Sequence, residues 1–496
     1  MSEIIDLTAQ AGFSIDGISS PCSAYSQYIY DSKLEYTLMK GTKAMREAGK
    51  LYLPQEEAES ENAYKNRLQR TFLYNLYKRT VKKLAGTVFS KPIIINTEDP
   101  DIRNLMFNFD FQGNNINVVG FRHFADAISY GVSHILVDYP DINLLDKNGQ
   151  MFIEKDGKFE LLSLKQEKEL NLRPFATVIP ATNIIGWKYE TVNGVRKLVN
   201  VRIKDTVTFP DGRFGEVKKE RIRVLTPGFY EVYIKEKDWE LVSGGKTGID
   251  YIPLFSFFTG EDINGLICDL PLEDLAYLNL EHWQSSSDQR NVLHYARLIT
   301  FLGIELDDAM EDKKIVIGCN QIVHSSSPTG DLRVVEHSGK AIEAGANDLR
   351  QIEKQMQEFG YNITNNKVSR ETATSRVIDS VEANSTLKNW ALNYNDLMNT
   401  IIDCMADYLG KEKASISTNS TEDIPDYVKV NTDINPSFGG VGADILTTAL
   451  KENSIDIENY LIELKRRGIL REGANIKHIL EKVKMQEKQN ADITTG

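Results

Sequence analysis

Hydrophobic positions recur at helical spacing in the part of the chain that ends near Lys91. Apolar side chains three or four residues apart share one face of a helix. The residues that keep this spacing are Tyr64, Leu68, Phe72, Leu76 and Leu84. Ser60 precedes them and suits an N-cap, because its hydroxyl can accept a hydrogen bond from the first helical turn. Pro92 ends the pattern. A second amphipathic helix is predicted near residues 118–130, followed by a strand at 134–139.

The apolar period changes to two between residues 173 and 258. β-Branched or aromatic runs stand at 175–179, 184–189, 198–203, 221–225 and 230–234. Asn193-Gly194, Asp211-Gly212 and Pro227-Gly228 punctuate them, and Asn-Gly or Asp-Gly between such runs is a strong hairpin signal. This segment predicts an antiparallel meander. The continuous apolar run at 252–258 predicts a strand buried on both faces.

Helical spacing returns at Pro271, a residue suited to the first position of a helix. The predicted helix extends to residue 299, and its central stretch, 284–290, is wholly polar. A helix that is apolar at both ends and polar between them is typical of one that leaves its own domain. We therefore expect this helix to pack against copies of itself.

Short strands, a helix and a polar loop are predicted next. The strands are expected at 315–318, 321–324 and 332–336. The apolar positions of the following helix are Leu349, Ile352, Met356 and Phe359. Residues 362–369 are mostly Asn, Thr, Lys and Ser, which favours a loop.

The longest helical pattern covers residues 371–409. About 35 residues with a rise of 1.5 Å each would give a helix of roughly 50 Å. A kink is expected at Asn384-Ser385-Thr386, where the apolar stripe weakens. A last helical cluster is predicted at 443–488, after a glycine hinge at 439–442. Helical blocks around one β meander place the chain in the α+β class.

The charge balance narrows the possible functions. The 496 residues include 58 Lys and Arg against 71 Asp and Glu, a formal net charge of −13. Such a chain is a poor candidate for binding nucleic acid through neutralised phosphates. The same charge suits a protein past which DNA slides without adhering. Hydrophobic residues make up 41% of the chain, so we expect a folded core.

Cysteine usage and the N-terminal residues indicate folding in a reducing cytoplasm. The cysteines lie far apart and form no C-x-x-C pair, which argues against a zinc or redox motif. They are Cys22, Cys268, Cys319 and Cys404. Residues 1–10 have no apolar core of the kind found in signal peptides. No run reaches the roughly 18 apolar residues that cross a bilayer, so we expect no membrane partner.

The residue pattern predicts no catalytic residue, cofactor or metal. Gly244-Gly245-Lys246-Thr247 ends like a phosphate-binding loop, but Glu240 occupies the position of its first glycine. The histidines after Pro271 lack metal-ligand spacing and are expected at the surface or at interfaces. They are His282, His294, His324 and His337. Trp390 and Tyr394 are expected in the core. We predict that the protein is not an enzyme.

The order of several short motifs resembles a known family. The motifs are YLP at 52–54, KRTVKKLAG at 78–86, FSKP at 89–92, YGVSHILVDY at 130–139, RPF at 173–175, IPL at 252–254, PLEDLA at 271–276, QM at 355–356 and ETATS at 371–375. Each motif is weak alone, whereas the ordered set is specific. Residues 45–475 thereby resemble the portal proteins, or head-to-tail connectors, of tailed bacteriophages. Residues 1–40 depart from this resemblance.

The resemblance implies an elongated portal fold. Residues 1–265 would form an N-terminal arm and a helical and β-rich wing, which includes the meander at about 173–258. The first stem helix would lie at 266–299 and the second at 341–361. A small β clip at 300–340 would separate the two stem helices.

The remaining part of the implied fold surrounds a channel. Residues 362–375 would hold the tunnel loop. Residues 376–438 would form the long tunnel helix and a return segment. The helical crown and the C-terminal tail would occupy 439–496.

The resemblance also implies a structural role in a virion. Portal subunits form a dodecameric ring at one capsid vertex, and the ring is the channel for genome packaging and ejection. The partners so implied are the terminase large subunit, head–tail adaptor proteins and the major capsid or scaffold protein. Double-stranded DNA would pass through without sequence specificity. We expect synthesis in the host cytoplasm and a final location at the portal vertex.

Candidate DNA-channel residues lie around the predicted tunnel loop. They are Lys354, Asn362, Asn365, Asn366, Lys367 and Arg370. A ring would repeat each basic residue, and such belts of charge would balance a passing phosphate backbone. The Asn amides can donate to phosphate oxygens. The competing interpretation is solvated surface charges and an ordinary polar turn.

Two other functions remain open from the sequence. One is a different head–tail adaptor or a capsid-associated structural protein, although adaptors are usually far shorter. The other is a DNA-processing enzyme, which would need clustered Asp, Glu and His with metal-ligand spacing.

Overall fold

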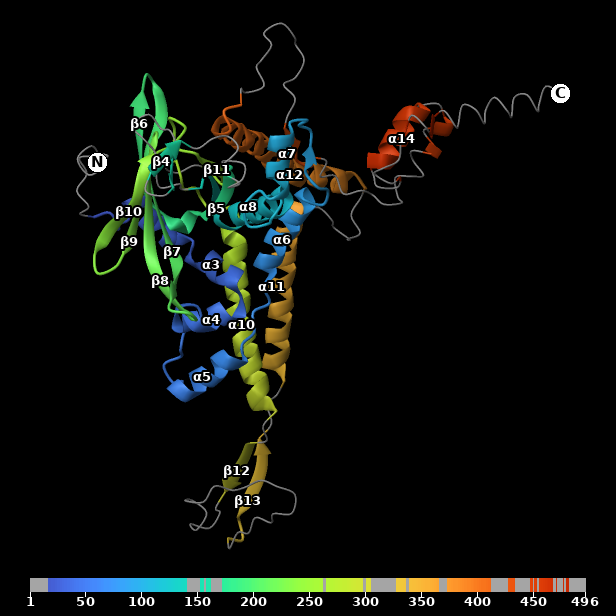
Figure 1. Cartoon of the computed structure of the whole chain (residues 1–496). Coiled ribbons are helices and arrows are strands. Elements are labelled where there is room, and N and C mark those ends of the chain that lie inside the picture. The colour runs from blue at the N-terminus through green and yellow to red at the C-terminus, as the bar shows by residue number, and fades with distance from the viewer. Residues whose placement is uncertain are drawn as a thin grey trace, which may run out of the picture. The chain divides into compact units, whose positions relative to one another are not determined.

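The chain forms two compact units, residues 1–432 and 433–496. The computed structural model describes residues 17–140, 152–155, 158–161, 172–261, 265–297, 300–304, 327–335, 339–364, 373–411 and 427–432 of the first unit. In the second it describes 447–448, 450–452, 455–466, 470, 476 and 479–480, which include helix α14 (Ile457–Arg466). Helices and strands are mixed along the first unit, so the fold is α+β (Figure 1).

Seven α-helices lie between residues 17 and 130. They are α2 (Ser23–Asp31), α3 (Lys33–Lys40), α4 (Thr42–Ala48), α5 (Glu61–Arg70), α6 (Leu76–Val88), α7 (Pro100–Phe107) and α8 (Ile116–Tyr130). The 3-10 turn η1 (Gly49–Leu51) follows α4. None of the helices within the described residues is long and apolar enough to cross a bilayer.

The pattern from Tyr64 to Leu84 is divided between α5 and α6. Ser60 caps α5 as predicted, since its hydroxyl accepts a hydrogen bond from the Ala63 N–H at 3.2 Å. The helix stops at Arg70, and Phe72 is 53% exposed and outside both helices. Asn75 then caps α6 by accepting from the Lys78 N–H at 2.9 Å. A second cap thus explains why one apolar period produces two helices.

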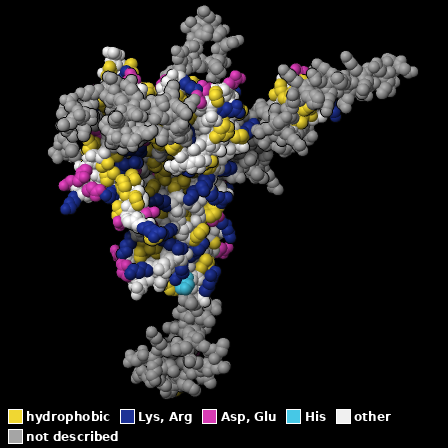
Figure 2. All heavy atoms as spheres, in the orientation of Figure 1, with side chains coloured by type: hydrophobic (Ala, Val, Ile, Leu, Met, Phe, Trp, Pro, Cys, Tyr) yellow, Lys and Arg dark blue, Asp and Glu magenta, His cyan; other side chains and the backbone are white. Residues whose placement is uncertain are grey.

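The outward face of α6 is basic. Its buried residues are Leu76, Tyr77, Thr80, Val81, Leu84, Ala85 and Val88. The exposed residues between them are Arg79, Lys82 and Lys83, whereas Lys78 is half-buried and donates to the Met39 carbonyl at 2.7 Å. Figure 2 shows Lys and Arg side chains gathered where Figure 1 places α6.

A three-stranded sheet lies against α8. Its order is β11 (Leu254–Phe258), β2 (Val132–Asp138) and β5 (Phe175–Pro180), all antiparallel. The strand that is buried on both faces is β2, in which residues 132–137 are all buried. The prediction that residues 252–258 form such a strand was wrong. As an edge strand, β11 buries Leu254 and Phe257 and leaves the residues between them partly exposed.

The predicted meander forms a separate five-stranded sheet. Its strands are β6 (Ile184–Val192), β7 (Val195–Asp211), β8 (Gly215–Thr226), β9 (Phe229–Lys235) and β10 (Trp239–Lys246), each paired with the next. The predicted turns are confirmed, since Asn193, Gly194, Gly212 and Gly228 have φ values of 53°, 80°, 66° and 78°. Gly244-Gly245-Lys246 lies inside β10, which excludes a phosphate-binding loop there.

The β7–β8 hairpin extends beyond its neighbouring strands. β6 pairs with β7 only up to Ile203, and β9 pairs with β8 only from Arg221 onward. At that boundary, the Arg221 guanidinium donates to both carboxylate oxygens of Asp205 at 2.8 and 2.7 Å. Residues 206–220 therefore form an arm whose two strands pair only with each other.

Two further strand pairs are short. β1 (Ile94–Ile95) pairs with β14 (Val428–Lys429). β3 (Phe152–Lys155) pairs with β4 (Lys158–Leu161).

An aromatic cluster joins α8, β11 and helix α12 (Ala373–Tyr408). The Tyr394 ring lies 4.8 Å from that of Phe257 and 5.1 Å from that of Phe124, measured between centroids. The Tyr394 hydroxyl donates to the Gly120 carbonyl at 3.2 Å. Tyr394 is fully buried, as predicted for a core residue. Neighbouring His123 is also buried, and this burial lowers its pKa to about 4, so the ring is neutral near pH 7.

A carboxyl group is buried beside the tyrosines of α2 and α6. Glu35 of α3 is 1% exposed, and within the described residues its Oε2 has no hydrogen-bond partner. Burial raises the pKa of Glu35 to about 7. The neighbouring Tyr28 and Tyr77 hydroxyls are directed elsewhere, to the carbonyls of Tyr130 and Ser129. The protonated form of Glu35 is therefore the form that folding favours.

The Glu35→Gln variant should be stabilised more at pH 8 than at pH 5. Because the folded pKa of Glu35 lies above its ordinary value of 4.5, its contribution to stability is complete below about pH 4.5. That contribution is lost as the pH rises through 7. As the pH rises through this window, the free energy of unfolding of the variant should increase by up to about 3 kcal/mol relative to that of the wild type. Urea unfolding at both pH values measures the difference.

Exposed Glu57 provides the control for this comparison. Glu57→Gln makes the same chemical change on the surface and should shift the unfolding midpoint equally at both pH values. A pH-independent effect of Glu35→Gln would contradict the assignment of a raised pKa.

Candidate functional site

Two antiparallel helices form the candidate stem. They are α10 (Glu273–Ala296) and α11 (Lys340–Thr364), close to the predicted ranges of 271–299 and 341–361. The hydrogen bonds between them confirm the antiparallel orientation, because residues later in α10 contact residues earlier in α11. Ser285 donates to Asp348 at 3.4 Å, and Gln289 donates to the Ile342 carbonyl at 2.8 Å.

A glycine allows the two helices to approach closely. A Cβ atom at Gly345 would collide with the Gln289 Oε1, so any larger residue would displace the Gln289 amide. That amide donates to the Ile342 carbonyl, so a larger residue at position 345 would disturb this hydrogen bond between the helices.

A strand pair lies between the stem helices along the chain. β12 (Thr300–Ile304) and β13 (Asp331–Val335) are antiparallel, with Thr300 opposite Val335 and Ile304 opposite Asp331. The predicted strand at 332–336 largely coincides with β13. The predicted strands at 315–318 and 321–324 lie outside the described residues.

The polar middle of α10 contacts its own chain. Ser286 and Ser287 are 6% and 1% exposed. Thr71 donates to the Ser287 hydroxyl at 2.9 Å, and Gln284 donates to the Tyr52 carbonyl at 3.1 Å. The stretch is therefore partly covered by its own chain, and the packing of this helix against other copies stays a prediction. Its polar side chains are matched by polar groups of the segment that precedes α6.

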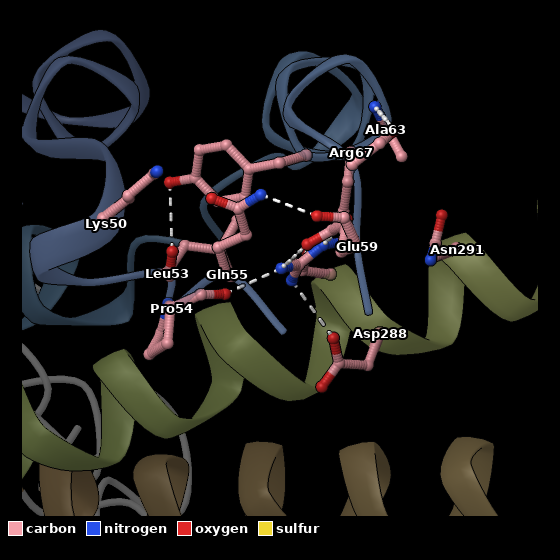
Figure 3. A network of polar contacts seen from close by, with 12 residues as sticks. Lys50, Leu53, Pro54, Gln55, Glu59, Ala63, Arg67, Asp288 and Asn291 are labelled. Carbon is pink, nitrogen blue, oxygen red and sulfur yellow. Dashed lines mark hydrogen bonds and ion pairs between the residues drawn. The ribbon is translucent and has the colours of Figure 1, made fainter. Parts of the chain in front are cut away.

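A buried arginine is the centre of this polar contact. The Arg67 guanidinium of α5 donates to both carboxylate oxygens of Glu59 at 2.9 and 2.8 Å and to the Pro54 carbonyl at 2.7 Å. It also reaches Asp288 of α10 at 3.3 Å (Figure 3). The Arg67 and Glu59 side chains are 5% and 11% exposed. Their hydrogen bonds lower the pKa of Glu59 and raise that of Arg67, so both groups stay charged.

A buried histidine also joins the stem helices. His282 is 4% exposed, and its Nε2 lies 3.3 Å from a carboxylate oxygen of Glu353. The expectation of a surface or interface histidine was wrong for His282, because α11 covers it within the same chain. His324 and His337 lie outside the described residues. Among the described residues no group of His, Cys, Asp and Glu could hold a metal ion.

The structure describes two of the six predicted DNA-channel residues, Lys354 and Asn362. Lys354 is exposed on α11, and its Nζ lies 3.7 Å from the Glu358 carboxylate one turn away. Asn362 was predicted in a loop, and this placement was wrong. Helix α11 continues to Thr364, because a polar sequence does not prevent the backbone hydrogen bonds of a last turn. Asn365, Asn366, Lys367 and Arg370 lie outside the described residues.

The long helix after this segment agrees with the pattern. α12 has 36 residues, against about 35 predicted. Its backbone is helical through Asn384-Ser385-Thr386, where a kink was expected. Its C-terminal half is anchored in the core by Tyr394, Met398, Ile401, Ile402 and Met405, all of them fully buried.

Sequence reasoning missed a second charged surface, on α10. The exposed residues of its first half are Glu273, Asp274, Tyr277 and Glu281. Tyr277 is 57% exposed. Burial raises the pKa of its hydroxyl, and Glu273 and other nearby acidic groups raise it further. A helical-wheel count of charges groups the acidic residues of α10 and the basic residues of α6, but it does not show which side of each helix is exposed.

Comparison with known proteins gives a family model and distant structures. The model described as "Domain of unknown function (DUF4055)" matches residues 271–409, the segment that contains α10, α11 and α12. No curated protein matches the chain.

Three similar solved structures are particle assemblies. "Virion of native gene transfer agent (GTA) particle" shares 9% identity with a TM-score of 0.37. "Neck of empty GTA particle computed with C6 symmetry" and "Neck of native GTA particle computed with C12 symmetry" share 10% identity, with TM-scores of 0.39 and 0.38. Each match covers 78% of this chain and 89% of the other. TM-scores this low do not establish a shared fold.

Replacing Arg67 by Met should destabilise the first unit strongly. The change leaves Glu59 buried without its partner and removes the link to Asp288. Loss of one partner of a buried ion pair costs about 3–5 kcal/mol. Urea unfolding followed by tryptophan fluorescence would report the change, because fully buried Trp283 lies on α10.

The matched control is Lys50→Met. Lys50 pairs with Glu61 at 2.7 Å, but both side chains are more than half exposed, at 55% and 61%. Surface pairs of this kind contribute about 0–1 kcal/mol. Equal effects of the two substitutions would show that the Arg67 network does not hold α5 against α10.

Proposed function

We propose that this chain is the portal subunit of a tailed phage or prophage. It would form a dodecameric ring at one capsid vertex and serve as the channel for genome packaging and ejection. The observation that carries the proposal is the element order at residues 273–408. Two antiparallel helices are separated along the chain by a strand pair, and a long helix follows. Such an arrangement suits the wall of a ring, with the strand pair as a docking tip.

Burial along α11 supports a role in an assembly. Between residues 340 and 359, where side chains are described, only Ile352 and Met356 are fully covered. Most of the remaining surface of α11 is polar and exposed. A helix covered on one narrow stripe has room for neighbouring subunits on its other sides.

The charge of the stem supports passage of DNA without adhesion. α10 and α11 together carry eight acidic residues against four basic ones, not counting histidine. Twelve copies around a channel would repel phosphate rather than bind it. The channel candidates would supply limited positive charge against this background. They are Lys354, Lys367 and Arg370, with the Asn362, Asn365 and Asn366 amides beside them.

The proposed partners follow from the same architecture. The ring would bind the terminase large subunit during packaging and head–tail adaptor proteins afterwards. It would sit against the major capsid or scaffold protein in the virion. Double-stranded DNA would be cargo, without sequence-specific contacts and without catalysis by this chain.

The purified chain should form closed rings. Twelve subunits of 56.1 kDa would have a mass of roughly 670 kDa. Light scattering after size-exclusion chromatography measures the mass, and negative-stain images of the same fraction show the central hole. A compact dimer or tetramer without a hole would contradict the proposal and favour an adaptor or an enzyme.

Deleting residues 365–370 should leave rings intact and reduce the DNA held in particles. These residues link α11 to α12 and include four of the channel candidates. Ring mass and encapsidated DNA are measured for the deletion and for a variant that changes only Lys367 and Arg370 to Ala. Loss of rings in the deletion variant, with normal DNA retention in the double variant, would show that the segment serves assembly instead.

A further inference from the structure

The basic face of α6 belongs to an unusually one-sided stretch of sequence. Residues 62–91 contain eight Lys or Arg and no Asp or Glu, although the whole chain has a net charge of −13. On α6, the exposed charges are those of Arg79, Lys82 and Lys83, and we call these three residues the basic stripe. Gly86 continues this face, and a Cβ atom there would meet nothing within 4 Å. The stripe is therefore accessible to a partner.

The exposed face of α10 has the opposite charge. Glu273, Asp274, Tyr277 and Glu281 form what we call the acidic stripe. Residues 274, 277 and 281 are three and four positions apart, so they share one side of the helix. Tyr277 places a large, half-exposed ring among the carboxylates, and tyrosine is enriched at the centres of protein interfaces.

The two stripes face away from each other within one copy. The Tyr77 N–H at the start of α6 donates to the Asn279 side chain of α10 at 3.0 Å. Asn279 is two residues from both Tyr277 and Glu281, which places it about 200° around the helix from them. α6 therefore lies on the side of α10 opposite the acidic stripe. The stripes of one chain cannot pair, whereas those of two adjacent chains can.

We propose that the basic stripe of α6 binds the acidic stripe of α10 on the next copy of this chain. The inference rests on the proposed ring and names its contact surfaces. A ring built from head-to-tail contacts needs two different, complementary patches on each subunit. Opposite charges on opposite sides of the α6–α10 pair meet this requirement, and their attraction would fix the direction of the contact.

Another copy of the chain fits the basic stripe better than DNA does. DNA bound to α6 would leave the acidic stripe unpaired on every subunit. The stem helices that follow α6 are acidic, so phosphate near them would be repelled. The contact between copies neutralises both stripes at once.

Paired charge reversals provide the test. One variant is Arg79→Glu with Lys82→Glu, and the other is Asp274→Lys with Glu281→Lys. Alone, each should need a protein concentration at least roughly tenfold higher than the wild type to form rings, because like charges then face each other. Co-expressed, the two should form rings again, since alternating subunits restore opposite charges at every contact. Light scattering and negative-stain images report both results.

Controls separate assembly from folding. Lys43→Glu with Lys65→Glu reverses two exposed basic residues outside the stripe and should leave rings unchanged. Circular dichroism verifies the fold of each variant. If a reversal variant unfolds, Arg79→Gln with Lys82→Gln replaces it and should raise the assembly concentration in low salt more than in high salt.

The outcomes distinguish this inference from the proposed function. A wild-type chain that never forms rings would overturn both. Wild-type rings together with unaffected reversal variants would overturn the stripe contact alone. Normal rings of the Arg79→Glu, Lys82→Glu variant with reduced DNA retention would assign the basic stripe to DNA and reject the contact between copies. Failure of the co-expressed pair to assemble would also reject it.

Discussion

The buried guanidinium of Arg67 fixes where α10 sits on the rest of the unit. A cation removed from water must be matched closely, and Arg67 is matched by the Glu59 carboxylate and the Pro54 carbonyl. The Arg67 guanidinium also donates a hydrogen bond to Asp288 on α10. Directional bonds of this kind admit one register along the helix, whereas an apolar contact tolerates sliding. The polar middle of α10 is thus a docking surface for the chain's own N-terminal helices.

The position of α11 follows from that of α10. His282, Ser285 and Gln289 each reach α11, and Gly345 leaves the space that the Gln289 side chain needs. Among the side chains of α11 that the structure describes, Ile352 and Met356 are buried. A stem built on polar contacts keeps much of its surface hydrophilic, which suits the proposed ring, in which these helices would face both neighbouring subunits and a water-filled channel.

Local signals in the sequence were reliable, and long-range ones were not. The Ser60 cap, the hairpin turns at 193–194 and 227–228 and the length of α12 depend on residues close in sequence, so the pattern predicted them. The partner of Ser287 stands more than two hundred positions away, at Thr71. The spacing of apolar residues carries no information about such a distant partner, so the contact of this polar stretch with Thr71 was not predicted. In the same way, β2 could not be placed between β5 and β11 without the fold.

The candidate site was predictable only in part for a related reason. The pattern located the two helices that bracket residues 365–372, because amphipathic spacing marks helix interiors well. It ended α11 too early, at 361, because polar residues such as Asn362 are equally compatible with a last helical turn and a loop. The charged faces of α6 and α10 became visible only once burial had shown which side of each helix points outward.

Because residues 206–220 form an arm, strands β7 and β8 are each more stable at one end than at the other. Near Ile203 and Ile222, both fully buried, β7 and β8 are flanked on both sides and pack on the core. Past Asp205, each strand has one neighbour, and two-stranded ribbons are marginal in water. Amide hydrogens within one continuous strand would then exchange with solvent at rates that climb steadily toward Asp211, as opening proceeds from the tip. The salt bridge of Arg221 with Asp205 marks where that fraying stops.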